Sequence, residues 1–578
     1  MKIFRRIIIV VLVLLLIGII GFCLCIAPNY KKSGYENRVN LVINYRNVTG
    51  SMKGEVIREN GNEYISLDDI NNYFDRYTYY DEKYNYIIAT GNGHIACFDI
   101  KAGTAEIDSK TVNAKIIEKN NLKYIPVNLL EEFYDIKVKY NESTNIVCIE
   151  STNTELKAAT TSLKLSIKSK QTNFSRTLEK VDKGSTLYVK DVNVNEDSSS
   201  NVVPETVKGK ISKWFNDIKK KLAKDWIVVR TENGTVGYIN KKSLDEIKTV
   251  RAAEKEVEEP VVSMVWDYFE NTIAIPKNNN DTTYKGVNVV SPAFMFVDDN
   301  GNIKENVGDS GLNYISWAKS KGYEIWSMVK CDNLLTDNMR NMLSDYKKRE
   351  ALINQIVQIC EKYSLNGVNI DMENINQSDK AYFSRLIIEL KPRLESRKMK
   401  LSVDVTAPDG SPNWSLCYDR KTIGDVADYI VFMAYDQTSK NGSRVGSNAS
   451  IEWVENNINK FIKNNEVDSK KIIVAIPFYS RMWKVNSDGT SAGSFDINMN
   501  KQEKYLAKAT KKEWLADACQ NYIEYVENGF TYKMWVEDEE SISKKLDLVK
   551  KYNLGGAAYW EKGCETENVW NVVEQKLF

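Results

Sequence analysis

Two carboxylates, Asp371 and Glu373, are spaced so that they could perform acid–base chemistry. They close the segment 365–373 (LNGVNIDME), where apolar and polar residues alternate, and a period of two predicts a β-strand. Asn369, Asp371 and Glu373 would then share one face. Two carboxyl groups so close cannot both ionise freely, so one is expected to hold its proton and act as a general acid. The alternative is an acidic strand end that only meets solvent.

The elements that must position this pair are strands and helices that alternate from residue 261 onward. Apolar strands are expected at 261–266, 287–291, 324–329, 367–372, 400–405, 429–433, 472–476 and 555–559. Amphipathic helices are expected between several of them, at 345–363, 379–394 and 451–464. Eight such units predict an α/β domain, a (β/α)8 barrel over 261–578, with its functional residues where the strands end.

The segment around the two acids resembles the DGxDxDxE signature of family 18 glycoside hydrolases. Asn366 and Asn369 stand where that family has its first and middle acids, while Asp371 and Glu373 match the last two. The resemblance implies that Glu373 protonates the glycosidic oxygen and then activates water, and that Asp371 orients the substrate's acetamide. Asn369 in place of the middle acid weakens the family's usual proton relay behind Asp371, although an amide can still hydrogen-bond that carboxylate.

Further matches to the family follow in order along the chain. Met433-Ala434-Tyr435-Asp436 resembles the MxYD strand end, which implies that the Tyr435 hydroxyl holds the acetamide oxygen and that Asp436 contacts the sugar. Trp560 matches the tryptophan that forms the floor of the central sugar site. Tyr479 and Trp535 are predicted to be walls of neighbouring sugar subsites.

The segments 476–481 (IPFYSR) and 534–538 (MWVED) look like the spore-cortex and cell-wall N-acetylglucosaminidase branch of the family. This implies retaining, substrate-assisted cleavage of peptidoglycan glycan after N-acetylglucosamine, without a metal or other cofactor. The typical N-terminal LysM repeats of spore members are not visible, which favours a wall enzyme over a spore-coat one. A chitinase and a non-catalytic glycan-binding barrel are the alternatives.

Residues 40–151 contain an internal repeat with an offset of 60 residues. Tyr64-Ile65-Ser66-Leu67 matches Tyr124-Ile125-Pro126-Val127, and each copy predicts strand, helix, strand. The pair resembles the small extracellular module named after the N-terminal domain of copper amine oxidases. One histidine, His94, cannot supply an imidazole copper site, so we expect a structural or wall-contacting role.

Short alternating strands are expected across 160–247, with a hairpin at Asn233-Gly234. The closing Gly237-Tyr238-Ile239 resembles bacterial SH3-like domains. Within this region, 207–224 predicts a basic amphipathic helix, either an insert packed on its own domain or a surface for anionic membranes. The charged stretch 248–260 predicts a linker.

The N-terminal residues 1–28 predict a short cytoplasmic stub and a transmembrane anchor. About 21 apolar positions, from 7 to 27, follow Lys2, Arg5 and Arg6, which is long enough for a bilayer. This predicts a single-pass protein of the cell membrane with its catalytic domain outside. Secretion after signal-peptide cleavage is the alternative.

The overall composition excludes several classes of function. With 79 basic and 78 acidic residues, the chain has no global attraction for nucleic acid. Its nine cysteines form no CxxC pair and it has one histidine, so a Cys/His zinc site and a His-based triad are excluded. A bridge between Cys97 and Cys148 stays open.

Overall fold

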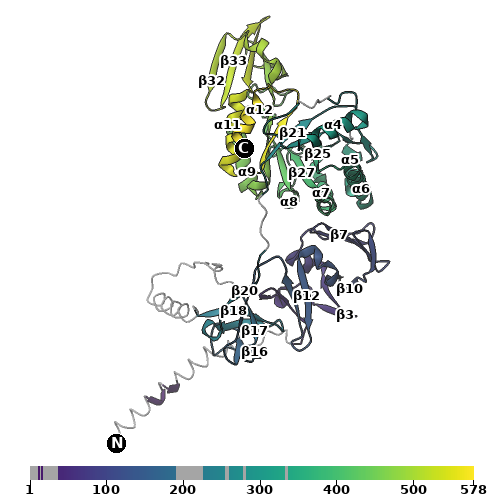
Figure 1. Ribbon diagram of the computed structural model, residues 1–578, viewed down its shortest axis with the longest axis vertical. Helices are drawn as coiled ribbons and strands as arrows, with labels where there is room; N and C mark the ends of the chain where they lie inside the picture. Colours follow the sequence, from purple (N-terminus) through teal and green to yellow (C-terminus); the bar gives the residue numbers. More distant parts are fainter. Residues whose placement is uncertain are drawn as a thin grey trace. The chain divides into compact units, whose positions relative to one another are not determined.

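The computed structural model describes residues 11–13, 15–16, 37–190, 225–253, 259–276, 282–331 and 336–578 (Figure 1). The chain divides into two compact units, 1–257 and 258–578. The first unit carries two β-rich parts, and the second carries the α/β domain predicted from the sequence.

The first part of unit one contains the predicted repeat. One copy runs β3 (Ile57–Glu59), β4 (Asn62–Ser66), α2 (Leu67–Tyr73), β5 (Tyr79–Asp81) and β6 (Tyr86–Gly91). The other runs β10 (Ile117–Lys119), β11 (Leu122–Pro126), the 3-10 turns Val127–Leu130 and Glu132–Tyr134, β12 (Ile136–Asn141) and β13 (Ile146–Ser151). β4 and β11 pair antiparallel, with Ile65 opposite Ile125. The likeness to the copper-amine-oxidase module stays a prediction.

The remaining strands of this part complete its sheets. They are β1 (Asn40–Ile43), β2 (Arg46–Asn47), β7 (His94–Asp99), β8 (Thr104–Ile107) and β9 (Lys110–Asn113). β1 lies between β13 and β2, while β5 to β9 form an antiparallel meander. Cys97 and Cys148 are free thiols, so the bridge between them does not form.

The second part of unit one is an antiparallel sheet with strand order β16-β15-β19-β18-β17-β14-β20. Its strands are β14 (Leu156–Thr160), β15 (Leu165–Lys168), β16 (Thr177–Val181), β17 (Thr186–Val189), β18 (Trp226–Thr231), β19 (Val236–Asn240) and β20 (Lys248–Arg251). The hairpin predicted at Asn233-Gly234 joins β18 and β19, with Gly234 in the left-handed region at φ 85°. The SH3-like assignment stays a prediction, and the helix predicted at 207–224 lies outside the described residues.

The structure differs from two sequence-based predictions, the start of the linker and the membrane anchor. The linker was predicted from residue 248, but Lys248–Arg251 form β20, which pairs with β14. The predicted single-pass membrane anchor is contradicted: in the part of the chain that the structure describes, no helix is both long and apolar enough to cross a bilayer. Apart from residues 11–13, 15 and 16, the predicted segment lies outside the described residues.

Unit two is built on a closed barrel of parallel strands. Among its described residues, the strands are β21 (Val262–Asp267), β22 (Val289–Pro292), β25 (Glu324–Lys330), β26 (Gly367–Asp371), β27 (Lys400–Val405), β28 (Tyr429–Met433), β29 (Ile472–Pro477) and β35 (Gly556–Trp560). Each pairs in parallel with its neighbours, and β22 pairs with β25 to close the ring. A short hairpin, β23 (Met295–Val297) and β24 (Ile303–Glu305), extends one edge. The predicted (β/α)8 barrel is confirmed, with every predicted strand present.

Helices surround this barrel. They are α4 (Gly308–Ser320), α5 (Thr336–Ser344), α6 (Tyr346–Tyr363), α7 (Lys380–Glu395), α8 (Arg420–Val426), α9 (Ile451–Lys463), α11 (Glu539–Tyr552) and α12 (Val569–Leu577). α6, α7 and α9 begin and end within one residue of their predicted bounds. Side-chain caps fix several starts: at α11 the Asp538 carboxylate accepts the Ser541 N–H at 2.9 Å, and the Ser541 hydroxyl accepts the Asp538 N–H at 3.0 Å.

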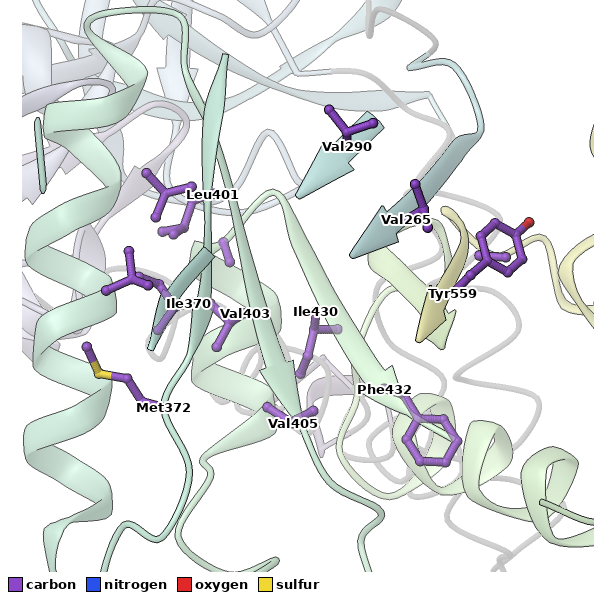
Figure 2. Close-up of a cluster of buried hydrophobic side chains, with 14 of the residues drawn as sticks. Val265, Val290, Ile370, Met372, Leu401, Val403, Val405, Ile430, Phe432 and Tyr559 are labelled. Carbon is purple, nitrogen blue, oxygen red and sulfur yellow. The ribbon is translucent and has the colours of Figure 1, made fainter. Parts of the chain in front are cut away.

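Alternation along the strands divides the buried side chains into two cores. One core lies inside the barrel and includes Met264, Trp326, Met328 and Val431. The other lies between strands and helices, and Figure 2 shows part of it, with Ile370 from β26 and Phe432 from β28 among its members. Val368, Ile370 and Met372 all belong to this outer core. The polar residues between them therefore face the interior of the barrel, as their spacing predicted.

The chain between β29 and α11 forms a separate antiparallel sheet. The described residues 479–536 supply β30 (Tyr479–Val485), β31 (Ser491–Asn498), the short helix α10 (Glu503–Leu506), β32 (Lys511–Leu515), β33 (Gln520–Glu527) and β34 (Phe530–Val536), in the order β31-β30-β34-β33-β32. β30 begins two residues after β29 ends. The insert is therefore anchored directly at the end of a barrel strand.

Candidate active site

A cavity of about 180 Å³ opens at the carboxyl ends of the barrel strands. Its lining residues are Trp266, Lys330, Asp371, Glu373, Asp404, Trp414, Met433, Tyr435, Asp436, Tyr479 and Trp560. Seven of these were predicted site residues: Asp371, Glu373, Met433, Tyr435, Asp436, Tyr479 and Trp560. The other four, Trp266, Lys330, Asp404 and Trp414, were not predicted from the sequence. This is the end of a (β/α)8 barrel where active sites are found.

Asn369 lies behind the cavity, fully buried in the barrel interior. Its Oδ1 accepts the Trp266 indole N–H at 2.8 Å, and its Nδ2 donates to Ser402 Oγ at 3.0 Å and to Asp404 Oδ1 at 2.7 Å. Both amide N–H groups are thus used by β27. The hydrogen bond from Asn369 to Asp371 that was considered from the sequence therefore does not form.

Asp371 ends β26 and is 5% exposed. Its Oδ2 accepts a hydrogen bond from the Lys330 ammonium, an ion pair made possible because Lys330 lies beside Asp371 in the parallel register of β25 and β26. Its Oδ1 is buried and has no hydrogen-bond partner among the described residues. A buried carboxylate oxygen without a donor is costly, so this atom is suited to receive a donor from a ligand.

Glu373 follows two residues later, on the loop after β26, and is half-buried at the cavity wall. The backbone before it is held by the Tyr418 hydroxyl, which donates to the carbonyl of Met372 at 3.0 Å. Asn374, next in the chain, adopts a left-handed conformation at φ 58°. This turn ends the strand and places the Glu373 carboxyl group beside Asp371 in the cavity.

Asp404 comes from β27 and is 2% exposed. Burial, together with the neighbouring Asp371 carboxylate, raises the pKa of Asp404 well above its usual range. The hydrogen bond from Asn369 and the charge of Lys330 oppose this rise. Asp404 therefore holds a proton more tightly than an exposed aspartate does.

Tyr435 and Asp436 come two and three residues after the last residue of β28. Burial raises the pKa of Tyr435 well above its usual range, helped by Tyr479 and the nearby carboxylates, so its hydroxyl stays a hydrogen-bond donor. Asp436 Oδ1 accepts from Arg481 Nη2 at 2.7 Å and from the Tyr479 hydroxyl at 3.2 Å. Asp436 is therefore held by Arg481 and Tyr479, both from β30, at this side of the cavity.

Aromatic rings form the rest of the wall. Trp560 ends β35, and its ring packs edge-on against Trp266 with centroids 5.7 Å apart and lies 6.1 Å from Tyr268. Trp414 comes from the loop between β27 and α8 and is 39% exposed. Flat rings of this kind suit the apolar face of a sugar. Trp535 lies on β34, packed against Tyr522, and is not among the described residues that line the cavity.

No group of three or more His, Cys, Asp or Glu side chains in the described ranges is arranged to hold a metal ion. The site consists instead of carboxyl groups in different environments, one ammonium, tyrosine hydroxyls and indole rings. Paired acids with separated proton affinities are suited to protonate a leaving group and then activate water.

Comparison with known families agrees with this chemistry. Residues 265–564, about half of the chain, match the model of glycosyl hydrolases family 18. The chain belongs to this family. It is a glycoside hydrolase, and the matched range includes the barrel strands from β22 to β35 and every residue that lines the cavity.

Several known proteins resemble part of the chain. The uncharacterized glycosylase YvbX of Bacillus subtilis is 26% identical over 297 residues, which cover 50% of this chain and 83% of that protein. The cortical fragment-lytic enzyme of Bacillus anthracis is 24% identical, over 43% of this chain and 58% of its own length. The spore cortex-lytic enzyme SleL of Bacillus megaterium, as a solved structure, is 20% identical with a TM-score of 0.48, covering 57% of this chain and 77% of that one.

Proposed function

We propose that the protein hydrolyses peptidoglycan glycan after N-acetylglucosamine, by retaining catalysis in which the substrate's acetamide is the nucleophile. The observation that carries the proposal is Asp371 Oδ1, a buried carboxylate oxygen of a cavity-lining residue that has no hydrogen-bond donor among the described residues. An acetamide N–H supplies such a donor. The glycan then needs a 2-acetamido sugar at the site, which N-acetylglucosamine provides.

The first half of the reaction uses three side chains. The Tyr435 hydroxyl and the Asp371 carboxylate hold the acetamide so that its carbonyl oxygen reaches the anomeric carbon. As that carbon–oxygen bond forms, the glycosidic bond breaks and Glu373 gives its proton to the leaving oxygen. The product is an oxazolinium ion, whose positive charge the Asp371 carboxylate offsets.

The second half reverses these roles. Glu373, now a carboxylate, takes a proton from a water molecule, and the oxygen of that water attacks the anomeric carbon. The bond from the acetamide oxygen breaks and the acetamide is restored. Two displacements at one carbon give retention of configuration, and Glu373 ends the cycle protonated.

Peptidoglycan is favoured as the substrate by the likeness to cortical fragment-lytic enzymes. Chitin is the second candidate, because a relative named probable endochitinase from Caenorhabditis elegans is 25% identical over 40% of this chain. Both polymers carry the acetamide that the proposed mechanism needs. A glycan-binding barrel without catalysis is disfavoured because Glu373 is retained at the cavity.

The test digests purified peptidoglycan and chitin oligomers with the protein and with its Glu373→Gln variant, and identifies released reducing ends by mass spectrometry. We expect fragments ending in N-acetylglucosamine from the parent and a loss of at least roughly 10³-fold in the variant. Release from chitin oligomers alone would replace peptidoglycan with chitin. Binding without release by both proteins would overturn catalysis.

A further inference from the structure

The cavity contains a lysine that the motif around Glu373 does not explain. Lys330 ends β25, is 6% exposed and has its ammonium on Asp371 Oδ2. The rings of Tyr268 and Trp560 lie 5.5 and 5.7 Å from the ammonium. A cation so enclosed loses most of its hydration, so its interaction with the carboxylate is stronger than that of a surface pair.

The charges around Asp371 show why this lysine matters. The titratable groups that face Asp371 are Lys330 on β25, Glu373 on its own segment, Asp404 on β27, Tyr418 before α8 and Tyr435 after β28. Glu561, after β35, also interacts with the charge of Lys330. Of these, Lys330 is the cation. Two further carboxyl groups, Glu373 and Asp404, would otherwise compete with Asp371 for the proton of the cluster.

Asn369 does not serve as a hydrogen-bond partner of Asp371. Its two amide N–H groups go to Ser402 and Asp404, and its oxygen goes to Trp266. Asp371 therefore depends on the neighbouring strand β25 for its positive partner. Because Lys330 occupies Oδ2, Oδ1 is the carboxylate oxygen that is left for a further donor.

We propose that Lys330 is a positioning residue for catalysis: it keeps Asp371 ionised and oriented toward the acetamide, and so leaves the proton of the acidic cluster to Glu373 and Asp404. This inference rests on the proposed function, and it deepens that function by naming the group that sets the state of Asp371. Burial and the charge of Asp371 raise the pKa of Asp404, in agreement with this distribution of protons.

The test compares the pH dependence of kcat/KM for the parent, Lys330→Met, Lys330→Gln and Lys330→Arg. Without the cation, Asp371 is more easily protonated, so the acidic limb moves upward by about 1 to 3 pH units in the Met and Gln variants. The Gln variant can still donate a hydrogen bond to Oδ2, which protects the result if the Met variant does not fold. The Arg variant keeps the positive charge, so we expect the acidic limb of its kcat/KM profile to stay at the parent's pH.

The matched control is Lys545→Met, which removes the ammonium of another buried ion pair of the same unit, with Glu537, away from the cavity. We expect this variant to lose stability without any movement of the acidic limb. A Lys330 series that also loses stability but keeps the parent's pH profile would overturn the proposal and make Lys330 a structural residue.

A second readout does not need activity. In protein with ¹³C-labelled aspartate carboxyl groups, the Asp371 signal is assigned with Asp371→Asn and titrated by NMR. We expect Asp371 to take up its proton at higher pH in Lys330→Gln than in the parent. An unchanged titration would overturn the inference even if the parent hydrolyses glycan. If the parent hydrolyses nothing, the proposed function fails while this titration still decides the role of Lys330.

Discussion

Arg481 Nη2 lies 2.7 Å from Asp436 Oδ1, and Arg481 Nε lies 2.8 Å from Asp496 Oδ1. One guanidinium thus joins the loop after β28 to strands β30 and β31 of the inserted sheet. Arg481 is only 3% exposed, so the planar fork holds both carboxylates in fixed positions. The insert is thereby connected to the wall of the cavity through a side chain as well as through the backbone.

Replacing Arg481 should weaken activity although the proposed acid, Glu373, stays in place. Arg481→Met leaves Asp436 with one fewer charged donor, and a hydrogen bond to a charged group contributes about 1.5–3 kcal/mol. We therefore expect kcat/KM on N-acetylglucosamine oligomers to fall by roughly 10- to 100-fold. Steady-state kinetics measure this. Arg481→Lys cannot reproduce the fork and should recover only part of the loss, whereas full activity of the Met variant would contradict the role given to the pair.

Trp414 should act as a sugar platform, although the motifs did not identify it. It lines the cavity and is 39% exposed. Trp414→Ala removes a flat apolar surface, and we expect KM to rise by roughly 5- to 30-fold with a smaller change in kcat. Trp514→Ala on β32 is the matched control, since Trp514 is 37% exposed and does not line the cavity. Equal effects of the two changes would argue against a platform.

Glu561, next to Trp560, provides a pH-dependent prediction of stability. Burial, then the charge of Asp267, raises the pKa of Glu561 to about 7, and its Oε2 is buried without a hydrogen-bond partner in the described structure. The folded state holds this proton more tightly than the unfolded state. The parent's stability contribution from Glu561 is therefore complete at low pH and declines as pH rises from about 4.5 to about 7.

Glu561→Gln cannot ionise and should not show this decline. The Tm of the variant relative to the parent is expected to increase between pH 4.5 and 7 and then to level off. Thermal unfolding in buffers of matched ionic strength measures it. Glu574→Gln is the matched control, because it makes the same chemical change at an exposed position of α12. A constant difference in Tm across this range would show that Glu561 is ionised throughout.

The positions of the barrel strands could be predicted because their apolar runs are long and regular. Asp371, Glu373, Tyr435 and Trp560 were predicted because they match family motifs at or beside the ends of such runs, and all four line the cavity. Lys330 was missed for a related reason: the predicted strand stopped at residue 329, where the apolar pattern ends, and β25 continues through Lys330. That Lys330 lies beside Asp371 depends on the register between two strands, which neither strand encodes by itself.

Asp404 illustrates a second limit of the sequence. It lies inside a correctly predicted strand, at an inward-facing position between Val403 and Val405. An acid at such a position is a signal that could have been used, because charged residues are rarely buried without a reason. The rise in its pKa, however, depends on burial and on the Asp371 carboxylate from another strand, and the hydrogen bond from Asn369 opposes that rise.

The contact between β4 and β11 should carry much of the stability of the first module. Ile65 and Ile125 are opposite each other and fully buried. Ile65→Ala and Ile125→Ala are each expected to lower the free energy of unfolding by about 2–5 kcal/mol. Urea unfolding followed by tyrosine fluorescence of the module measures both. Because the two side chains lie at one contact, the double variant is expected to deviate from the sum of the single ones, and strict additivity would show that they do not interact.

The register of that contact is symmetric about Ile65 and Ile125. Ile65 and Ile125 are equivalent in the two copies, and Ser66 opposite Tyr124 is balanced by Tyr64 opposite Pro126. The two copies are thus related by a local two-fold axis, like the subunits of a symmetric dimer whose interface is made of the same patch twice. The module has the form of such a dimer within one chain, so removing either half would expose the strand by which the other half pairs.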